Sequence, residues 1–550
     1  MGGNLESGER QVMLYAPIAL IFIPVFSALV IYLVKARFIH YLALIAQAAM
    51  TVLAILYYQT YTGNFADTFF VIGGWDARIG ISLINDPLSL SFVFLSLFTW
   101  WMVLIYTFNT KQDNRTFLFF LMFLQGVFLG LLQTNDLFNM FVFLELTTII
   151  VTILIAFKKA GDSFRAGIYY LLLNTSGVLM FLIGIILLYF TFGTINVNTI
   201  QEAMQAGVLV TGEEYAVRFA YVLLMAGISV KAALFPVFTW LPKAHGVAMS
   251  AISGLLSGLV VKGGLYLFIR MNEMFAGAQI DYTLFFYVVG ALTAVIGVMF
   301  ALTQKDMKQV LAYHTISQVG IVMMGLAHYD EQTAFGGLLH IFNHALFKTL
   351  LFLGAGIIIK AYNNKKIKEI RGVMRTMPVV SIFMIVGMLS ITGAPFFNGF
   401  ISKSIIKYGI QASGIKYWIL FIVNIGTATS FIKMSQVFFG PKVMTLRIKE
   451  MGQRIALMTL AFSCVILGNL YIPISEGFFG IDVSHVSAVK WEAFFDYAVA
   501  LILGFCFYKL VIEKDPRAVR KIREFNVSFE TANYLFMLYV AVMVVYFVLL

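Results

Sequence analysis

Residues 223–270 read LLMAGISVKAALFPVFTWLPKAHGVAMSAISGLLSGLVVKGGLYLFIR. This stretch is long enough for two helices of about 20 residues, the length that crosses the hydrocarbon core of a bilayer. Apolar runs of the same kind recur from one end of the 550-residue chain to the other. Helix is the expected conformation of each run, because a bilayer core cannot hydrate an open backbone. The pattern therefore predicts an all-α polytopic membrane protein.

The overall composition supports the same class of protein. Hydrophobic residues make up 61% of the chain and charged residues only 12%, about half of the ~25% that is usual in soluble domains. A soluble enzyme, a disordered chain and a nucleic-acid-binding domain are therefore excluded. The lipid bilayer is the expected surrounding, and the net charge of +11 is better explained by basic cytoplasmic loops than by a nucleic-acid partner.

The cysteine content restricts the chemistry that the chain can perform. Cys464 and Cys506 both lie inside apolar runs, and no CxxC motif or Cys/His cluster accompanies them. The chain cannot hold a cysteine-ligated iron–sulfur cluster or a c-type haem. We therefore expect no cofactor, no metal and no catalytic residue in this chain, and we expect any redox chemistry to lie on another polypeptide.

The apolar runs predict about sixteen membrane-spanning helices. The first eight are expected near residues 15–35, 38–60, 87–108, 115–134, 136–157, 165–192, 216–240 and 245–270. The second eight are expected near residues 282–303, 308–328, 332–360, 378–402, 416–440, 455–474, 491–512 and 531–550. The polar stretches between them are too short to form a soluble domain, so any function must reside in the membrane or at its surfaces.

The basic residues predict the orientation of these helices. Loops after odd-numbered helices, counted with the adjoining span ends, carry 26 Lys and Arg residues. The opposite side carries 8, namely Arg10, Arg78, Arg218, Arg270, Lys403, Lys407, Lys416 and Lys490. Because cytoplasmic loops are enriched in positive residues, we expect a plasma-membrane protein with cytoplasmic basic loops and both termini outside. Lys403, Lys407 and Lys416 are the main exceptions to this bias.

Several charged residues fall inside the predicted spans. They are Lys231, Lys262, Lys348, Lys433 and Glu145. At the centre of a bilayer each costs about 2.5–3.5 kcal/mol on insertion scales, so such residues normally face a protein interior or water and mark an ion path. Lys433 lies near a span end, from which its side chain can reach the surface. Glu492 and Asp496 fall only in the first turns of their span, within reach of water.

The remaining buried charges are open to two interpretations. A purely structural role is one of them for Glu145, Lys231 and Lys262, and for Glu145 it would be a static ion pair with a lysine. A switchable proton store is the other, because moving or neutralising a carboxylate beside a buried lysine would release the lysine proton. We favour the second interpretation.

Residues 336–356 read GGLLHIFNHALFKTLLFLGAG. His340, His344 and Lys348 are four residues apart in turn, so they share one helix face and span about 12 Å of the helix axis. Histidine gains and loses protons near neutral pH, which favours a titratable relay. Histidines that only pack between helices remain an alternative, and a metal site is disfavoured because no third ligand accompanies the pair.

Two of the predicted helices contain helix-breaking residues. Residues 229–246 read SVKAALFPVFTWLPKAHG, with Pro236 in the middle, and residues 390–407 read SITGAPFFNGFISKSIIK, with Pro395 between two glycines. Proline removes a backbone hydrogen bond and bends a helix. Lys403 follows the second break, which would place it inside the membrane; an ordinary lysine at the membrane interface is the alternative.

The two breaks fall in the seventh and twelfth predicted spans, five helices apart. Interrupted helices at corresponding positions indicate a transporter core with inverted repeats. We therefore expect helices 1–3 in residues 1–112, one five-helix repeat in 113–272, an inverted second repeat in 273–440, and further helices in 441–550.

The motifs also resemble those of a known family. Residues 223–270, residues 301–327 (ALTQKDMKQVLAYHTISQVGIVMMGLA) and residues 340–356 resemble, in this order, the signatures of antiporter-like subunits. These subunits occur in respiratory complex I, in Mrp-type multisubunit Na+/H+ antiporters and in membrane-bound hydrogenases. The resemblance covers roughly residues 85–440. Residues 135–148 (NDLFNMFVFLELTT) are most similar to the branch that holds the D-type subunits of Mrp antiporters and the hydrogenases.

The resemblance implies roles for individual residues. In the family, two inverted five-helix bundles each contain a broken helix and a key charged residue. Glu145 matches the fifth-helix glutamate, paired with Lys231 on the broken seventh helix, and Lys262 matches the eighth-helix lysine of the polar axis. The central relay of the eleventh helix and the terminal residue of the twelfth are matched by His340, His344, Lys348 and Lys403.

Family cores usually have fourteen helices, so the last two predicted helices are additional, and we expect them to dock against a neighbouring subunit.

Three functions follow as hypotheses. The first is a proton-translocating subunit that works with other membrane subunits, either in an Mrp antiporter or in an ion-translocating oxidoreductase with a peripheral redox module. The second is a self-sufficient Na+/H+ antiporter, which is disfavoured because sodium requires several oxygen ligands and the sequence offers only one deep carboxylate. The third is a structural scaffold, which leaves the cost of the buried charges unexplained.

Overall fold

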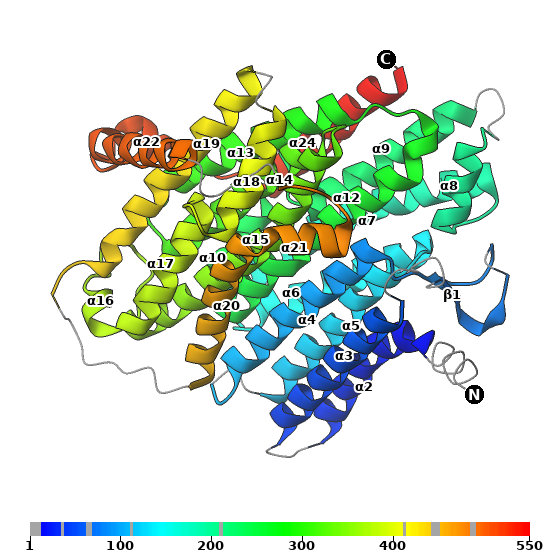
Figure 1. The fold of residues 1–550 in the computed structure, drawn as a ribbon, viewed down its shortest axis with the longest axis horizontal. Helices are drawn as coiled ribbons and strands as arrows, with labels where there is room; N and C mark the ends of the chain where they lie inside the picture. The colour runs from blue at the N-terminus through cyan, green and yellow to red at the C-terminus, as the bar shows by residue number, and fades with distance from the viewer. Residues whose placement is uncertain are drawn as a thin grey trace. The chain divides into compact units, whose positions relative to one another are not determined.

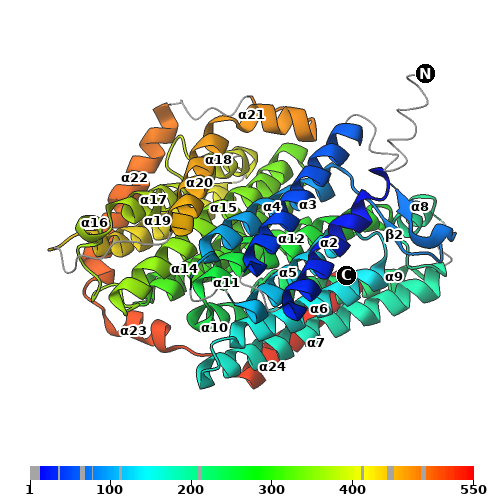
Figure 2. The same ribbon diagram turned by 90° about the horizontal axis from the view of Figure 1, so that it is seen from below.

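The computed structural model of the chain describes residues 13–34, 38–61, 69–76, 78–110, 114–207, 213–410, 414–441, 451–484 and 491–549. Some basic residues that enter the orientation prediction lie outside these described residues, namely Arg10, Lys35, Arg37, Lys111, Lys442, Arg447, Lys449 and Lys490. Figure 1 and Figure 2 show the ribbon in two views.

The protein is nearly all helical, as predicted. Within the described ranges, 13 helices are long and apolar enough to cross a membrane. Every one of the predicted spans coincides with a helix or with an interrupted pair of helices. The predicted spans outside the set of 13 are the seventh, the tenth and the twelfth, of which the seventh and twelfth are the two with breaks.

The chain forms two compact units. The first unit contains residues Met1–Lys231, Gly263–Asp281 and Asn533–Leu550. Its helices include α2 (Ala16–Leu33), α3 (Ile39–Tyr61), α4 (Pro87–Thr107), α5 (Arg115–Gln133), α6 (Leu137–Ala156), α7 (Gly161–Phe192), α8 (Val197–Gln205), α9 (Glu213–Lys231) and the short η4 (Phe275–Ala278). Helix α7 packs against both α6 and α9, which places the charged positions of these helices close together.

A small antiparallel strand pair lies between α3 and α4 in the first unit. It consists of β1 (Phe70–Val71) and β2 (Ser82–Leu83), with Phe70 opposite Leu83. The short helix η2 (Ile72–Gly74) follows β1. Asp86 then caps α4 by accepting a hydrogen bond from the Ser89 amide at 2.8 Å, as acidic residues commonly do at helix starts.

The second unit contains residues Ala232–Lys262 and Tyr282–Ala532. Its helices include α10 (Trp240–Val247), α11 (Ser250–Leu255), η3 (Leu256–Val260), α13 (Thr283–Thr303), α14 (Met307–Leu326), α15 (Glu331–Tyr362), α16 (Val373–Thr376), α17 (Pro378–Thr392), α18 (Asn398–Ile410), α19 (Gly414–Ser435), η5 (Gln436–Phe438), α20 (Met451–Asn469), α21 (Tyr471–Ile474), η6 (Ser475–Phe479), α22 (Trp491–Phe507), η7 (Tyr508–Ile512) and α23 (Arg517–Glu524).

Helix α15 is the central helix of the second unit. It packs against α11, α14, α17, α18 and α20, which lie around it in Figure 2. Its 32 residues span about 48 Å at 1.5 Å per residue. The relay residues predicted on this helix are therefore enclosed by protein.

Both predicted breaks are present in the backbone. Helix α9 ends at Lys231 and α10 begins at Trp240, with Pro236 between them, whereas α17 ends at Thr392 and α18 begins at Asn398, with Pro395 between them. Each break contains a non-glycine residue with a positive φ, Ala233 at 56° and Phe396 at 70°. Such backbone conformations cost energy and tend to occur at functional sites.

Two helices cross the division between the units. Helix α12 (Val261–Met274) begins in the second unit and continues in the first. Helix α24 (Phe529–Val544) does the same, and η8 (Val545–Leu549) follows it in the first unit. Within the first unit, α24 packs against α9: Tyr539 and Ser229 are joined through their hydroxyl groups at 3.0 Å. The last helix of the chain therefore contacts α9 close to Lys231.

Candidate functional site

Glu145 lies on α6 and is half-buried. Its Oε1 accepts a hydrogen bond from the Thr175 hydroxyl on α7 at 2.8 Å. Its Oε2 is buried and has no hydrogen-bond partner among the described residues. A buried carboxylate oxygen without a partner is costly, which makes this position a natural acceptor for a hydrogen bond from a water molecule.

Lys231 is the last residue of α9 and is 3% exposed. Its ammonium donates a hydrogen bond to the Thr148 hydroxyl of α6 and lies 5.9 Å from the centre of the Tyr170 ring. Thr148 is one helical turn from Glu145 on α6. No direct salt bridge joins Lys231 and Glu145 among the described residues. Thr148 holds the ammonium, and the Glu145 carboxylate attracts it from a longer distance.

Lys262 is fully buried at the start of α12. It follows the π-helical turn η3, in which the backbone carbonyl groups are displaced from the regular α-helical pattern. The Lys262 ammonium donates to the Ser257 carbonyl in this turn. The Ser257 hydroxyl is in turn hydrogen-bonded to the Thr315 hydroxyl of α14 at 2.8 Å. Turns of this kind within helices often mark functional sites.

His340 and His344 on α15 are both fully buried, and their rings lie nearly parallel with centres 6.3 Å apart. His340 uses both ring nitrogens, Nδ1 with the Ser402 hydroxyl at 2.8 Å and Nε2 with Gln318 Oε1 at 3.1 Å. Neither ring nitrogen of His344 has a hydrogen-bond partner within the residues that the structure describes. His344 is therefore the member of the pair whose ring nitrogens are open to a hydrogen bond with water.

No metal site accompanies these histidines in the described part of the chain, where no group of three or more His, Cys, Asp or Glu side chains is placed to hold an ion.

Lys348 continues the same face of α15 and is fully buried. Its ammonium donates to the Leu311 carbonyl of α14 at 2.5 Å and lies 5.7 Å from the centre of the Phe352 ring. His340, His344 and Lys348 thus lie along one helix, as the spacing predicts.

Lys403 lies on α18, directly after the second break, and is 5% exposed. Its ammonium donates to the Ile391 carbonyl at 2.7 Å, close to the end of α17. The carbonyl groups at a helix C-terminus lack partners within the helix and carry a partial negative charge. The break between α17 and α18 therefore creates the oxygen that holds this lysine.

Lys433 on α19 shows a different environment. Its ammonium donates to three carbonyl oxygens at the end of α13: Ala301 at 3.0 Å, Leu302 at 2.7 Å and Gln304 at 2.8 Å. An ammonium has three protons to donate, so this lysine is fully satisfied and caps α13. The four buried lysines of the predicted relay each have one hydrogen-bond acceptor among the described residues; they are Lys231, Lys262, Lys348 and Lys403.

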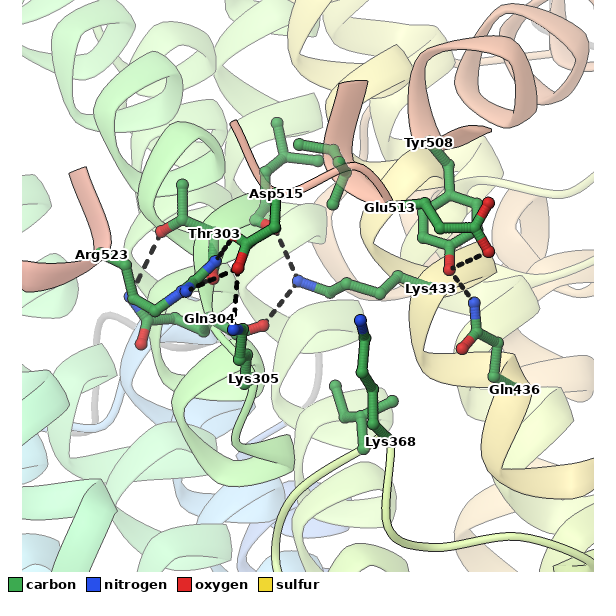
Figure 3. A pocket seen from close by; sticks show the side chains of 13 residues that line it. Thr303, Gln304, Lys305, Lys368, Lys433, Gln436, Tyr508, Glu513, Asp515 and Arg523 are labelled. Atoms are coloured by element: carbon green, nitrogen blue, oxygen red, sulfur yellow. Dashed lines mark hydrogen bonds and ion pairs between the residues drawn. The ribbon is translucent and has the colours of Figure 1, made fainter. Parts of the chain in front are cut away.

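Lys433 also lines a cavity of about 40 Å³ within the second unit, which Figure 3 shows at close range. Asp515 lies at the centre of an ionic cluster there and accepts from Arg523 and from Lys305. The hydrogen bond from Arg523, together with Lys305, holds the pKa of the Asp515 carboxyl well below its usual range. Arg523 also donates to the Thr303 carbonyl at 2.6 Å, so this cluster fastens α23 to the end of α13.

Sequence reasoning missed two buried histidines of the second unit. His245 follows the first break and stacks on Phe352 at 4.5 Å, and His314 on α14 lies 4.9 Å from the Phe431 ring. Both are fully buried, and neither uses a ring nitrogen in a hydrogen bond to another described residue. Both stand inside the motifs that carry the resemblance, and their position within apolar runs was a signal that could have identified them.

The profile of the family described as "NADH:quinone oxidoreductase/Mrp antiporter, TM" matches residues 134–433. This match covers more than half of the chain, including all seven predicted proton-transfer residues. The chain belongs to this family. The resemblance inferred from the motifs is confirmed.

A curated relative supports the assignment. The chain is 31% identical over 345 residues to an Na(+)/H(+) antiporter subunit of the D type from Alkalihalophilus pseudofirmus, and the match covers 61% of this chain and 68% of the relative.

Three solved structures share the fold. A chain of the archaeal membrane-bound sulfane sulfur reductase superposes with a TM-score of 0.76 at 24% identity, covering 90% of this chain and 99% of that one. A chain of the Mrp complex from Dietzia sp. DQ12-45-1b gives a TM-score of 0.70 at 20% identity, covering 95% and 99%. A chain of respiratory complex I from Thermus thermophilus gives 0.72 at 21% identity, covering 90% and 99%. The protein is an antiporter-like membrane subunit of the kind found in multisubunit complexes.

Proposed function

We propose that this protein moves protons across the membrane along a path of buried titratable side chains. In the first unit the path comprises Glu145 and Lys231. In the second unit it comprises Lys262, His340, His344, Lys348 and Lys403, with water molecules between them. The chain passes from the first unit to the second directly after Lys231, and back directly after Lys262.

The hydrogen bonding of the lysines supports this proposal most strongly. Lys433 shows what a structural lysine looks like, because all of its donors have acceptors. Each lysine of the path has a single neutral oxygen as acceptor among the described residues, which leaves two donor positions for water and no carboxylate to hold the charge permanently. Such a group can change its protonation state without breaking an ion pair.

Coupling to a partner starts at Glu145 in this proposal. Its side chain is half-buried and has a free oxygen among the described residues, so it can respond to a change of charge in a neighbouring subunit. A proton that binds Glu145 removes a negative charge near Lys231, and the lysine proton then moves onward. The direction of net transport depends on the partner that drives the change.

The partners are other membrane subunits of one complex, as in the three structural neighbours. A peripheral redox module is part of this proposal if the complex is an oxidoreductase like the sulfane sulfur reductase. The protein lies in the plasma membrane, with its basic loops facing the cytoplasm and both termini on the outer side. Residues 113–272 and 273–440 form the two inverted repeats, each with one of the two broken helices.

Sodium–proton exchange by this chain is the second candidate function. The Alkalihalophilus pseudofirmus relative carries the name of an Na(+)/H(+) antiporter, which favours it. Within the described residues, however, the path from Glu145 to Lys403 contains one carboxylate, and its other members are nitrogen bases that do not bind a hard cation. The path is therefore more suitable for protons, and sodium would move elsewhere in the complex.

The decisive experiment replaces Lys231 in the complex that contains this chain, reconstituted in lipid vesicles. Proton movement is followed with a pH-sensitive dye after the complex is energised. We expect Lys231→Ala to abolish coupled proton transport while the complex still assembles. The exposed Lys368 is the matched control, and Lys368→Ala should leave the rate unchanged. Near-normal transport by the Lys231→Ala complex would contradict the proposal.

A further inference from the structure

Helix α22, which follows the part of the chain matched by the family profile, packs against the second broken helix. Three neighbouring residues of α22 make the contact. The Phe494 ring lies 5.7 Å from the Phe396 ring in the break, and the Tyr497 hydroxyl lies 3.0 Å from the Thr392 hydroxyl at the end of α17. Between these two, the Asp496 carboxylate forms an ion pair with Lys407 of α18.

The ion pair adjoins the last residue of the proposed path. Lys407 lies four residues after Lys403 on α18, and residues with this spacing are neighbours on one helix face. The Lys403 ammonium is held by the Ile391 carbonyl, and the next residue, Thr392, is the one that Tyr497 contacts. Helix α22 therefore meets both sides of the break that holds Lys403.

Exposure increases along this row of charged groups. Lys403 is 5% exposed, whereas the Lys407 and Asp496 side chains are 34% and 37% exposed. The Lys407 ammonium also lies 5.3 Å from the centre of the Tyr417 ring. A buried lysine is thus followed by a lysine–carboxylate pair that water can reach.

We propose that the Lys407–Asp496 pair is the terminal proton-transfer site of the path, with its carboxylate supplied by the appended helix α22. The Lys407 ammonium gives its proton to the Asp496 carboxylate, which leaves a neutral amine and a neutral carboxylic acid. The acid releases the proton to water and becomes a carboxylate again, and the amine takes the next proton from Lys403. This inference rests on the proposed function of the path.

The contacts argue against a purely structural ion pair. Pairs of this exposure contribute only about 0–1 kcal/mol, and α22 is already held by Phe494, by Tyr497 and by its packing against α19. Asp496 lies only in the first turns of its span and is reached by water, so the pair adds little to docking and stands where a proton can leave the protein.

The test measures proton transport by the reconstituted complex with Asp496→Asn. Asparagine keeps the size and can still accept a hydrogen bond from Lys407, but it cannot carry a proton. We expect the amount of assembled complex to stay unchanged and the transport rate to fall by about tenfold or more, in line with the loss of a general acid–base group. Asp496→Glu should restore most of the rate. Glu492→Gln, on the same helix one turn earlier, is the matched control and should transport normally.

A second variant covers the case in which Asp496→Asn impairs assembly. The double variant Lys407→Met/Asp496→Leu replaces the pair by apolar contacts, which proteins generally tolerate. We expect it to assemble and to transport slowly. A normal rate in this assembled variant, or in assembled Asp496→Asn, would overturn the inference.

The two proposals fail in different ways. If Lys231→Ala and Lys403→Ala abolish transport but assembled Asp496→Asn transports normally, the path is correct and the terminal site is not. If the two lysine variants themselves transport normally, the path is wrong as well.

Discussion

The number of oxygen atoms around its ammonium distinguishes Lys433 from the lysines that we propose as proton carriers. Lys433 has three acceptors and closes the end of α13. Among the described residues Lys231 has one, the Thr148 hydroxyl, which itself donates to the Leu144 carbonyl at 2.9 Å. A hydroxyl in this position can accept from a charged ammonium or donate to a neutral amine. Thr148 therefore suits a lysine that changes its protonation state.

Replacing Thr148 by valine tests this contact. Valine keeps the shape but removes the acceptor, so the buried Lys231 ammonium loses its partner at a cost of about 1–3 kcal/mol. We expect a lower melting temperature of the purified complex and slower proton transport. Thr152→Val on the next turn of α6 is the control, because the Thr152 hydroxyl donates to the backbone of its own helix. Equal effects of the two substitutions would show that the Thr148 contact has no special role.

At the level of the elements, the two interrupted helices position the lysines. The first break ends α9 at Lys231, and the second exposes the carbonyl groups of α17 to Lys403. Gly393 ends α17 with a φ of +80°, a conformation that glycine adopts without strain. Gly399 allows close packing, since a Cβ atom there would clash with the Ser390 carbonyl oxygen.

The close approach of α18 to α17 predicts a large effect of Gly399→Ala. The added methyl group would push the backbones apart, and overpacking of this kind typically costs about 1–3 kcal/mol. We expect a clear fall in the thermal unfolding midpoint of the complex and a loss of transport. Gly414→Ala at the start of α19 is the matched control, because a Cβ atom there meets no described atom within 4 Å. An unchanged midpoint for Gly399→Ala would mean that the α17–α18 contact tolerates separation.

At the scale of the whole molecule, the buried fraction of each helix indicates which helices face lipid or partner subunits. In the helical segment Ser250–Ala278, 94% of the apolar window is buried inside the protein, whereas in Phe494–Ile512 only 17% is buried. The first segment carries Lys262, and the second includes most of α22. Helices with so little buried surface must face lipid or partner subunits, since large apolar surfaces are not left in water.

The identity of the partners can be determined by mass spectrometry of the complex that co-purifies with this chain in mild detergent. We expect further membrane subunits. Iron–sulfur and nickel or flavin subunits would identify a redox-driven pump, and small hydrophobic subunits alone would identify an Mrp-type antiporter. Recovery of a single chain that transports ions without partners would contradict the assignment to a multisubunit complex.

Much of the architecture could be predicted from the sequence because it depends on local properties. Apolar runs of bilayer length predicted the helices, and prolines within such runs predicted the breaks after Lys231 and before Lys403. The cost of burying a charge marked Glu145, Lys262 and Lys348, since no neighbour is needed to recognise that cost. The motifs also predicted the family, which the profile match confirmed.

The sequence by itself thus determined the membrane class, the helix order and the positions of the charged residues along each span. Only the tertiary structure decided which atoms hold those charges: Thr148 rather than Glu145 at Lys231, three carbonyl groups at Lys433, and Asp496 of α22 at Lys407. The physical reason is that helix formation and membrane insertion depend on neighbouring residues in the chain. Hydrogen bonds between helices join residues far apart in the sequence, 83 positions for Lys231 and Thr148, and depend on how the helices pack.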